Sequence, residues 1–419
     1  MTAPTPSSIA PTLRRSRRSV GAIFALNGFL AAMWVAHIPV ISARTEVDHD
    51  QLGGLLLLLG ASAFVGMQVC GRLIDRRGSR PVTIGAALLL SAVIITPVLA
   101  VDALTLAAAL VAFGFANGCL DVSMNAQAVV VERAYRRPIM SSFHGFFSAG
   151  SLVGSGVVAA TLWADVGVIL TVACAAMTGV GVVAWSARGL AGREVGTDAS
   201  ARGVDVADTA STKWWRTVDR RRLVLLAVVA FALMLAEGTA YDWSALHVVE
   251  TFGSAEAVGA IAFGAFSATM TVARFVIDPV VGSVGPVAVV RYGGLLGTAG
   301  ILIAVLSPVP GLAIVGWGVF GLGLAGLIPQ IFTAAGNLSG ESSGRTISAV
   351  VGCGYLGMLA GPAVVGFISS RTSLNTGLLA AVVALVLAVA LAPVVRPQGA
   401  RVPAPRGHLG EGARSSDAT

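Results

Sequence analysis

The sequence predicts an all-α membrane protein, with twelve transmembrane helices in two six-helix halves related by pseudo-two-fold symmetry. Of the 419 residues, 55% are hydrophobic and only 12% are charged, whereas a soluble domain carries about twice that share of charge. The apolar residues fall into twelve runs, each long enough to cross a hydrocarbon core about 30 Å thick. A central polar stretch separates the first six runs from the last six.

The apolar runs set the expected helices. These helices are expected at residues 20–41, 51–74, 81–101, 103–131, 139–162, 166–187, 222–246, 256–280, 285–306, 309–333, 345–369 and 373–395. The chain is then divided into a cytoplasmic N-terminal tail (1–19), a first half (20–187), a cytoplasmic linker (188–221), a second half (222–395) and a disordered cytoplasmic tail (396–419). The linker is rich in Gly, Ala, Ser, Thr and Asp, which is typical of a flexible connection.

The basic residues predict the orientation of these helices. If residues 1–19 lie in the cytoplasm, all 28 Lys and Arg residues except Arg44 and Arg371 fall in segments on the cytoplasmic side. The positive-inside rule therefore places both termini in the cytoplasm of a multi-pass protein of the cell membrane. Topology also accounts for the net charge of +7, so no nucleic-acid partner is expected.

A basic ten-residue turn between the second and third helices carries a recognisable pattern. Gly71, Asp75, Arg76, Gly78 and Arg80 occur there in an order that resembles the signature of the major facilitator superfamily. The resemblance covers residues from about 20 to 395. It implies a secondary transporter in which two halves rock to expose a central site alternately to each side of the membrane, and it makes this turn a conformational gate.

The gate pattern recurs weakly in the second half. Arg274, Asp278 and Gly282 form a partial copy at the end of the eighth helix. Since this copy is less complete, we expect the gate to depend mainly on Asp75. Asp75 is expected to accept hydrogen bonds from a helix N-terminus or to pair with an arginine of a neighbouring loop, with Arg133 as the candidate.

Three further stretches resemble the fucose-permease-related branch of the superfamily. They are Gly118–Gln127, Ser142–Gly145 and Glu237–Ser244. The resemblance implies a proton symporter with an acidic residue on the fourth helix. That helix has no arginine between Leu104 and Val131, a difference from many drug–proton antiporters.

Charged residues inside a membrane helix are costly unless they face a cavity or a partner, so each is a functional candidate. Asp121 shares one helix face with Asn117 and Asn125, at spacings of four residues, and is the expected proton-carrying carboxylate. Glu237 and His144 are the other expected proton-coupling residues. The alternatives are structural hydrogen bonds for Asp121, a structural pair for Glu237 and an interfacial position for the histidine.

A polar solute needs carboxylate and amide groups for its hydroxyls and aromatic rings for its apolar faces. Trp243 has an alternative role as a residue of the interfacial aromatic belt. The residues expected to bind such a solute are Asn27, Asn117, Asn125, Tyr241, Asp242, Trp243 and Gln330.

Other function classes receive less support. The four cysteines lie in apolar runs without metal-type spacing, and no metal, cofactor or nucleotide motif is present, so no cofactor is expected. The expected function is proton-coupled transport of a small polar solute such as a sugar or polyol, by a monomer in the lipid bilayer. The alternatives are a proton-coupled efflux antiporter for amphipathic compounds and, more remotely, an intramembrane enzyme.

Overall fold

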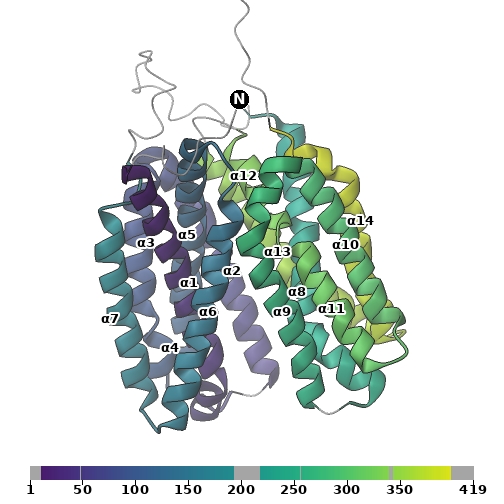
Figure 1. Ribbon diagram of the computed structural model, residues 1–419. Coiled ribbons are helices and arrows are strands. Elements are labelled where there is room, and N and C mark those ends of the chain that lie inside the picture. The colour runs from purple at the N-terminus through teal and green to yellow at the C-terminus, as the bar shows by residue number, and fades with distance from the viewer. Residues whose placement is uncertain (1–10, 48, 193–217, 255, 339–342, 398–419) are drawn as a thin grey trace, which may run out of the picture.

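The structure is a computed structural model that describes residues 11–47, 49–192, 218–254, 256–338 and 343–397. In these ranges the regular structure is helical and contains no strand. Twelve helical segments are long and apolar enough to cross a membrane. They form two groups of six that stand side by side (Figure 1), which confirms the predicted all-α, two-half architecture.

The first half contains seven helices in six spans, because a break at Ile94 and Ile95 divides the third span. Its elements are α1 (Pro11–Thr45), α2 (His49–Arg77), α3 (Ser79–Val93), α4 (Thr96–Leu99), α5 (Ala103–Tyr135), α6 (Met140–Trp163) and α7 (Val168–Ala187). Since α1 begins at Pro11, the basic residues Arg14 to Arg18 lie in its first turns and do not belong to a separate tail.

The second half repeats this plan, with its tenth span divided at Ala325 and Gly326. Its elements are α8 (Arg220–Phe252), α9 (Glu256–Val284), α10 (Pro286–Leu306), α11 (Pro310–Leu324), α12 (Leu327–Gly336), α13 (Ser343–Ser369), α14 (Leu374–Leu391) and the 3₁₀ turn η4 (Ala392–Val395). Most of the expected linker and C-terminal tail lies outside the described residues.

Two glycines mark equivalent turns in the halves. Gly78 ends α2 with φ of 84°, and Gly285 ends α9 with φ of 83°. Such positive φ values are readily adopted only by glycine, so both turns use the same local device. The copy of Gly78 in the second half is therefore Gly285, and the sequence-based assignment to Gly282 is wrong.

A capping box stabilises the first turn of α5. The Asp102 carboxylate accepts the backbone N–H of Thr105 at 2.8 Å, and the Thr105 hydroxyl accepts the backbone N–H of Asp102 at 3.2 Å. This reciprocal capping box satisfies two amides that the first helical turn leaves free. The hydrogen bonds from Thr105 also hold the pKa of Asp102 below its usual value.

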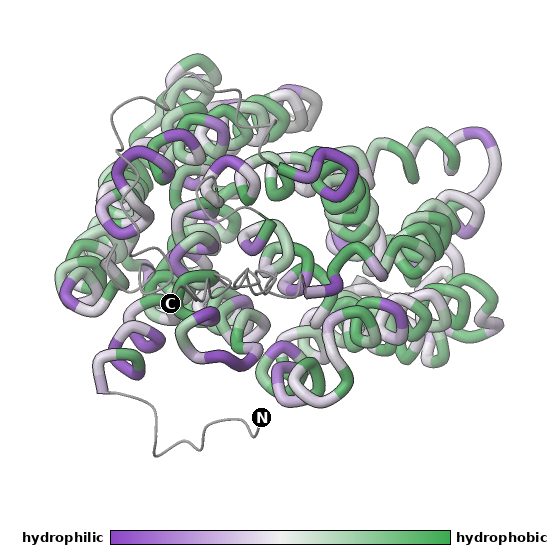
Figure 2. The backbone as a smooth tube through the Cα atoms, turned by 90° about the horizontal axis from the view of Figure 1, so that it is seen from above, coloured by the Kyte–Doolittle hydropathy of each residue, from purple (hydrophilic) through white to green (hydrophobic). Residues whose placement is uncertain are grey.

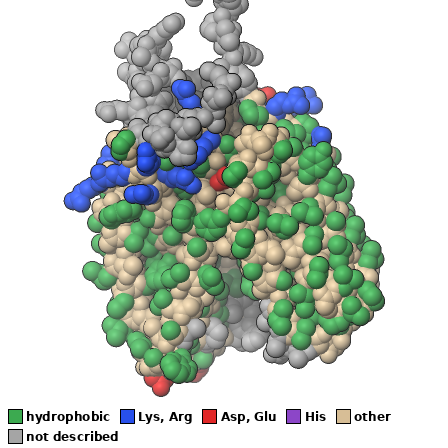
Figure 3. Space-filling model, viewed as in Figure 1, with side chains coloured by type: hydrophobic (Ala, Val, Ile, Leu, Met, Phe, Trp, Pro, Cys, Tyr) green, Lys and Arg blue, Asp and Glu red, His purple; other side chains and the backbone are tan. Residues whose placement is uncertain are grey.

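Charged and apolar side chains are segregated along the bundle. On the face shown in Figure 3, Lys and Arg gather at one end, whereas Asp and Glu lie at the opposite end and in small patches near the basic end. Viewed from above, hydrophilic positions lie mainly at the helix ends and hydrophobic ones along the helices (Figure 2). Large side chains such as Leu152 and Val383 are exposed on the outside, as expected for contact with lipid. We refer to the two ends as the arginine-rich end and the opposite end.

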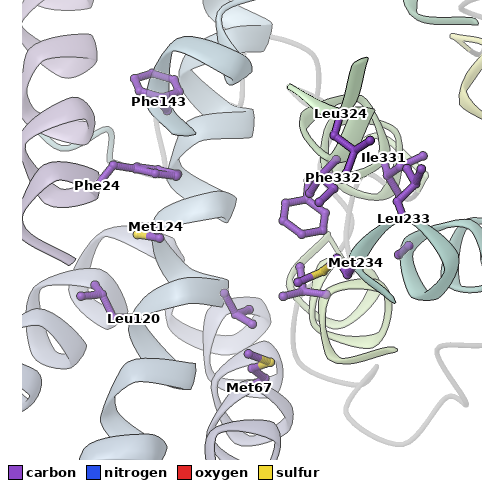
Figure 4. Close-up of a cluster of buried hydrophobic side chains, with 14 of the residues drawn as sticks. Phe24, Met67, Leu120, Met124, Phe143, Leu233, Met234, Leu324, Ile331 and Phe332 are labelled. Carbon is purple, nitrogen blue, oxygen red and sulfur yellow. The ribbon is translucent and has the colours of Figure 1, made fainter. Parts of the chain in front are cut away.

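Buried aromatic, aliphatic and methionine side chains lie on both halves near their boundary (Figure 4). Phe24 of α1 stacks on Phe143 of α6, with ring centroids 5.6 Å apart. Phe332 of α12 comes from the second half and lies 5.8 Å from the His144 ring. The polar groups described next are therefore enclosed by apolar packing.

Candidate functional site

An ion pair lies between the halves, deep within the spans. Arg274 of α9 donates to the Glu237 carboxylate of α8 at 3.0 Å. Only 5% of Arg274 and 4% of Glu237 is exposed. Arg274 also donates to the Ser148 hydroxyl of α6 at 2.9 Å. One guanidinium thus neutralises an acid of its own half and binds the other half directly.

Asp121 of α5 is nearly as buried as this ion pair, at 7% exposed. Its Oδ1 atom accepts a long hydrogen bond of 3.4 Å from the Asn125 amide. The hydroxyl of Tyr355, in α13 of the second half, lies close enough to interact with Asp121. It also interacts electrostatically with Glu237. We call the set Asp121, Ser148, Glu237, Arg274 and Tyr355 the polar centre.

Several buried oxygens around the polar centre accept no hydrogen bond from the described residues. The Asn125 amide nitrogen donates to the Asp121 backbone carbonyl at 2.9 Å, so the amide oxygen must point the other way. A buried acceptor without a donor costs about 1–3 kcal/mol of stability. Such unpaired groups are uncommon in folded proteins, and each one needs an explanation. The unpartnered oxygens are Asn27 Oδ1, Asn117 Oδ1, Asp121 Oδ2, Asn125 Oδ1 and Glu237 Oε2.

His144 and Gln330 lie in the same region. The His144 ring contacts the Phe24 ring, 5.4 Å between centroids, and it interacts electrostatically with Arg274. Its Nε2 atom is buried and has no hydrogen-bond partner among the described residues, and the same holds for Gln330 Nε2. Both side chains thus place an unpartnered nitrogen inside the bundle.

The three candidates on the outer part of α8 have different surroundings. Tyr241 lies one turn from Glu237, contacts Phe263 and Phe266 of α9, and is 42% exposed. Asp242 is exposed. Trp243 packs beside Gly366 of α13, and its buried indole N–H has no hydrogen-bond partner within the described ranges. Only Tyr241 shares the face of Glu237.

At the arginine-rich end, Asp75 connects the halves. Its Oδ1 atom accepts the backbone N–H of Gly344, at the start of α13, at 3.0 Å. Its Oδ2 atom lies 3.2 Å from Nε of Arg345. The predicted helix N-terminus is therefore present, but the predicted partner Arg133 is wrong. Arg133 instead hydrogen-bonds Gly336 O and Asn337 Oδ1 of the second half.

Two carboxylates share the start of α6. Glu132 accepts the backbone N–H groups of Ile139 and Met140, at 2.8 and 2.7 Å. Asp278, from the second half, accepts those of Ser141 and Ser142, at 3.0 and 2.9 Å. Four amides that a helix N-terminus leaves free are thus satisfied.

Asp278 binds the start of α6 just as Asp75 binds the start of α13. Both halves therefore contribute an acid to the contacts at this end. Arg274, the arginine of the partial copy, pairs with Glu237 instead of a residue at this end. We call Asp75, Glu132, Arg133, Asp278 and Arg345 the gate contacts.

Sequence reasoning missed Arg274, Tyr355 and Ser148. Arg274 was assigned to the basic residues that set topology, although it lies within an apolar run and the rule for intramembrane charges applies to it. Tyr355 and Ser148 gave no comparable signal, because a hydroxyl in an apolar helix is common.

A polar centre between two repeated six-span halves is the arrangement of a multi-pass secondary transporter. Residues 19–254 match the model of the major facilitator superfamily. The chain belongs to this superfamily, as the motif at Gly71–Arg80 predicted, and family and fold are those of transporters and not of enzymes.

Known relatives agree with this assignment. An uncharacterized MFS-type transporter of Yersinia pestis is 32% identical over 352 residues, which cover 84% of this chain and 88% of the relative. The structure of FucP in the outward conformation has a TM-score of 0.76 at 15% identity, with 91% of this chain and 98% of FucP covered. A variant of FucP, the E. coli fucose:proton symporter, has a TM-score of 0.72 at 14% identity over the same shares. The resemblance to the fucose-permease-related branch is thus confirmed at the level of the fold.

Proposed function

We propose that the protein is a proton-coupled transporter of a small, neutral, hydroxyl-rich solute such as a sugar or polyol, with Asp121 as the proton-carrying residue. The observation that carries this proposal is the charge balance of the polar centre. Glu237 and Arg274 neutralise each other at 3.0 Å, whereas Asp121 has no cationic partner among the described residues. Removal from water favours the neutral form of a carboxyl group, so a proton is the natural counter-charge for Asp121.

The unpartnered oxygens support a solute that donates hydrogen bonds. Asn27, Asn117, Asn125, Asp121 and Glu237 together offer five acceptors. Hydroxyl groups would satisfy them, whereas a carboxylate or phosphate would place further acceptors against them. The positive charge of Arg274 is already offset by Glu237, which further disfavours an anionic solute. Gln330 and Tyr241 would add a donor and an aromatic surface.

The gate contacts support a role in alternating access. The hydrogen bonds of Asp75, Glu132, Arg133 and Asp278 join the halves at the arginine-rich end, which the positive-inside rule assigns to the cytoplasm. The similarity to FucP in its outward conformation agrees with a state that is closed to the cytoplasm.

The other candidate residues are given roles around Asp121. Glu237 and His144 are proposed to act with Asp121, since both interact with Arg274, which binds both halves. Asp242 and Trp243 are proposed to line the entry of the solute. We further propose that the protein acts as a monomer in the cell membrane, with both termini in the cytoplasm.

Transport by reconstituted protein tests the proposal. Proteoliposomes with an inward proton gradient are screened with labelled sugars, polyols and drugs. Asp121→Asn should lose gradient-driven accumulation of the solute and retain counterflow, because a neutral amide preserves the shape of the site but carries no proton. Normal accumulation by Asp121→Asn would refute the assigned coupling residue.

An efflux antiporter for amphipathic compounds is the second candidate. The rings of Phe24 and Phe332 on either side of His144 favour it, because they offer an apolar surface next to the polar centre. Drug extrusion without sugar or polyol uptake in the same proteoliposomes would select this function and reject the first.

A further inference from the structure

A cavity of about 450 Å³ lies at the arginine-rich end of the second half, where α8 begins and α14 ends. It is separate from the polar centre and from the gate contacts. Its apolar walls are formed by Leu225, Ala390, Leu391, Pro393 and Val394, and Asp219, Arg221, Arg222, Arg396 and Pro397 complete its lining. The cavity thus combines an aliphatic wall with three guanidinium groups.

The charges in this cavity are not balanced. Asp219 is occupied by its own helix, since its carboxylate accepts the backbone N–H of Arg222 at 3.1 Å. Arg222 is held in place by the carbonyl groups of Val394, at 3.0 Å, and Arg396. The exposed side chains of Arg221 and Arg396 have no acidic partner in the described ranges. Three cations against one carboxylate leave a site that favours an anion.

The position of the cavity in the bilayer identifies the kind of anion. The span of α8 begins at Arg220, and the span of α14 and η4 ends at Val395. The arginines therefore lie at the level of the lipid headgroups, and Leu225 and Leu391 lie directly below, in the hydrocarbon region. Arginines at this level attract the anionic lipids of the cytoplasmic leaflet.

We infer that this cavity binds one anionic phospholipid, with its phosphate on Arg221 and Arg396 and an acyl chain along Leu225 and Leu391. The C-terminal residues 398–419 are a poorer occupant, because they carry Arg401, Arg406 and Arg414 against Glu411 and Asp417. A soluble phosphate would leave the apolar wall uncovered. The inference is independent of the proposed solute and coupling residue.

Binding of short-chain lipids to the purified full-length chain tests this site. Native mass spectrometry in detergent would compare dioctanoyl-phosphatidylglycerol, dioctanoyl-phosphatidylcholine and inorganic phosphate. We expect one tightly held phosphatidylglycerol, bound about tenfold or more above phosphatidylcholine, because two arginines act on its charge. Equal binding of both lipids would overturn the inference, and so would competition by inorganic phosphate at equal concentration, which would indicate a phosphate site.

Matched variants locate the site. Arg221→Gln with Arg396→Gln should abolish the preference for phosphatidylglycerol. Arg188→Gln with Arg291→Gln removes the same charge from exposed positions outside the cavity and should preserve the preference. Helical content by circular dichroism verifies that both double variants are folded. A preference that survives the first pair, or is lost equally in both pairs, would refute binding at this cavity.

Discussion

The Asp278 carboxylate, near the end of α9, accepts the backbone N–H of Ser141 in the opposite half at 3.0 Å. Asp75, near the end of α2, accepts the backbone N–H of Gly344 at the same distance. Each half therefore uses one acid to bind the first turn of a helix in the other half. The interaction combines a charge-assisted hydrogen bond with the favourable end of a helix dipole.

This symmetry predicts that Asp75→Asn and Asp278→Asn open the arginine-rich end to a similar extent. Hydrogen bonds to a charged group are worth about 1.5–3 kcal/mol, so losing the charge should raise the open population about tenfold. Spin labels at Arg188 and Arg291, exposed residues of different halves, would report the opening by double electron–electron resonance. Glu250→Gln, at an exposed carboxylate of the opposite end, should leave the distances unchanged. Opening by Asp75→Asn alone would restore the asymmetric gate expected from the sequence.

The close approach of α2 and α13 gives a second prediction. A Cβ atom on Gly71 would lie 2.6 Å from Ser348 Cβ and 3.0 Å from the Gly344 carbonyl oxygen. Gly71→Ala should therefore separate α2 from α13 and open the gate in the same spin-label measurement.

Gly85→Ala is the matched control, because a Cβ there meets no described atom within 4 Å. In a helix, alanine is favoured over glycine by about 0.5–1 kcal/mol. Gly85→Ala should thus keep the gate closed and slightly raise the thermal stability. Identical gate distances in both variants would show that the contact at Gly71 does not hold the halves together.

The sequence predicted the fold because its signals are local. Apolar length sets each span, and the motif Gly71–Arg80 depends on neighbouring residues. The stripe of Asn117, Asp121 and Asn125 was also predictable, because a spacing of four residues defines one face of a helix. Of the three, Asp121 interacts with Tyr355 of the second half.

The parts of the site that were not predicted from the sequence depend on contacts between helices that are distant in the sequence. Nothing near Arg274 in the sequence indicates that Glu237, 37 residues away, is its partner. The approach of Tyr355 to Asp121 depends on the packing of α13 against α5 across the two halves. The role of Asp278 was underestimated for the same reason, since its partner amides lie in α6.

The ion pair of Glu237 and Arg274 predicts strong coupling between substitutions. Either Glu237→Gln or Arg274→Gln leaves one buried charge without its partner, at a cost of about 3–5 kcal/mol. The double variant removes both charges and should recover most of the thermal stability, which a melting curve in detergent would measure. If the losses of thermal stability in the two single variants add up in the double variant, Glu237 and Arg274 do not stabilise the fold as an ion pair.

The contact between Tyr355 and Asp121 predicts that proton binding at Asp121 depends on the relative position of the two halves. Its hydroxyl belongs to the second half and interacts with Asp121 of the first, so rocking of the halves must change this contact. Tyr355→Phe preserves the ring and removes the hydroxyl. Gradient-driven accumulation should fall about tenfold, the equivalent of roughly 1.4 kcal/mol, and solute counterflow should persist. Tyr292→Phe, at an exposed position of α10, should retain both activities. Equal loss of counterflow and accumulation in Tyr355→Phe would mean that Tyr355 holds the solute and does not act on the proton site.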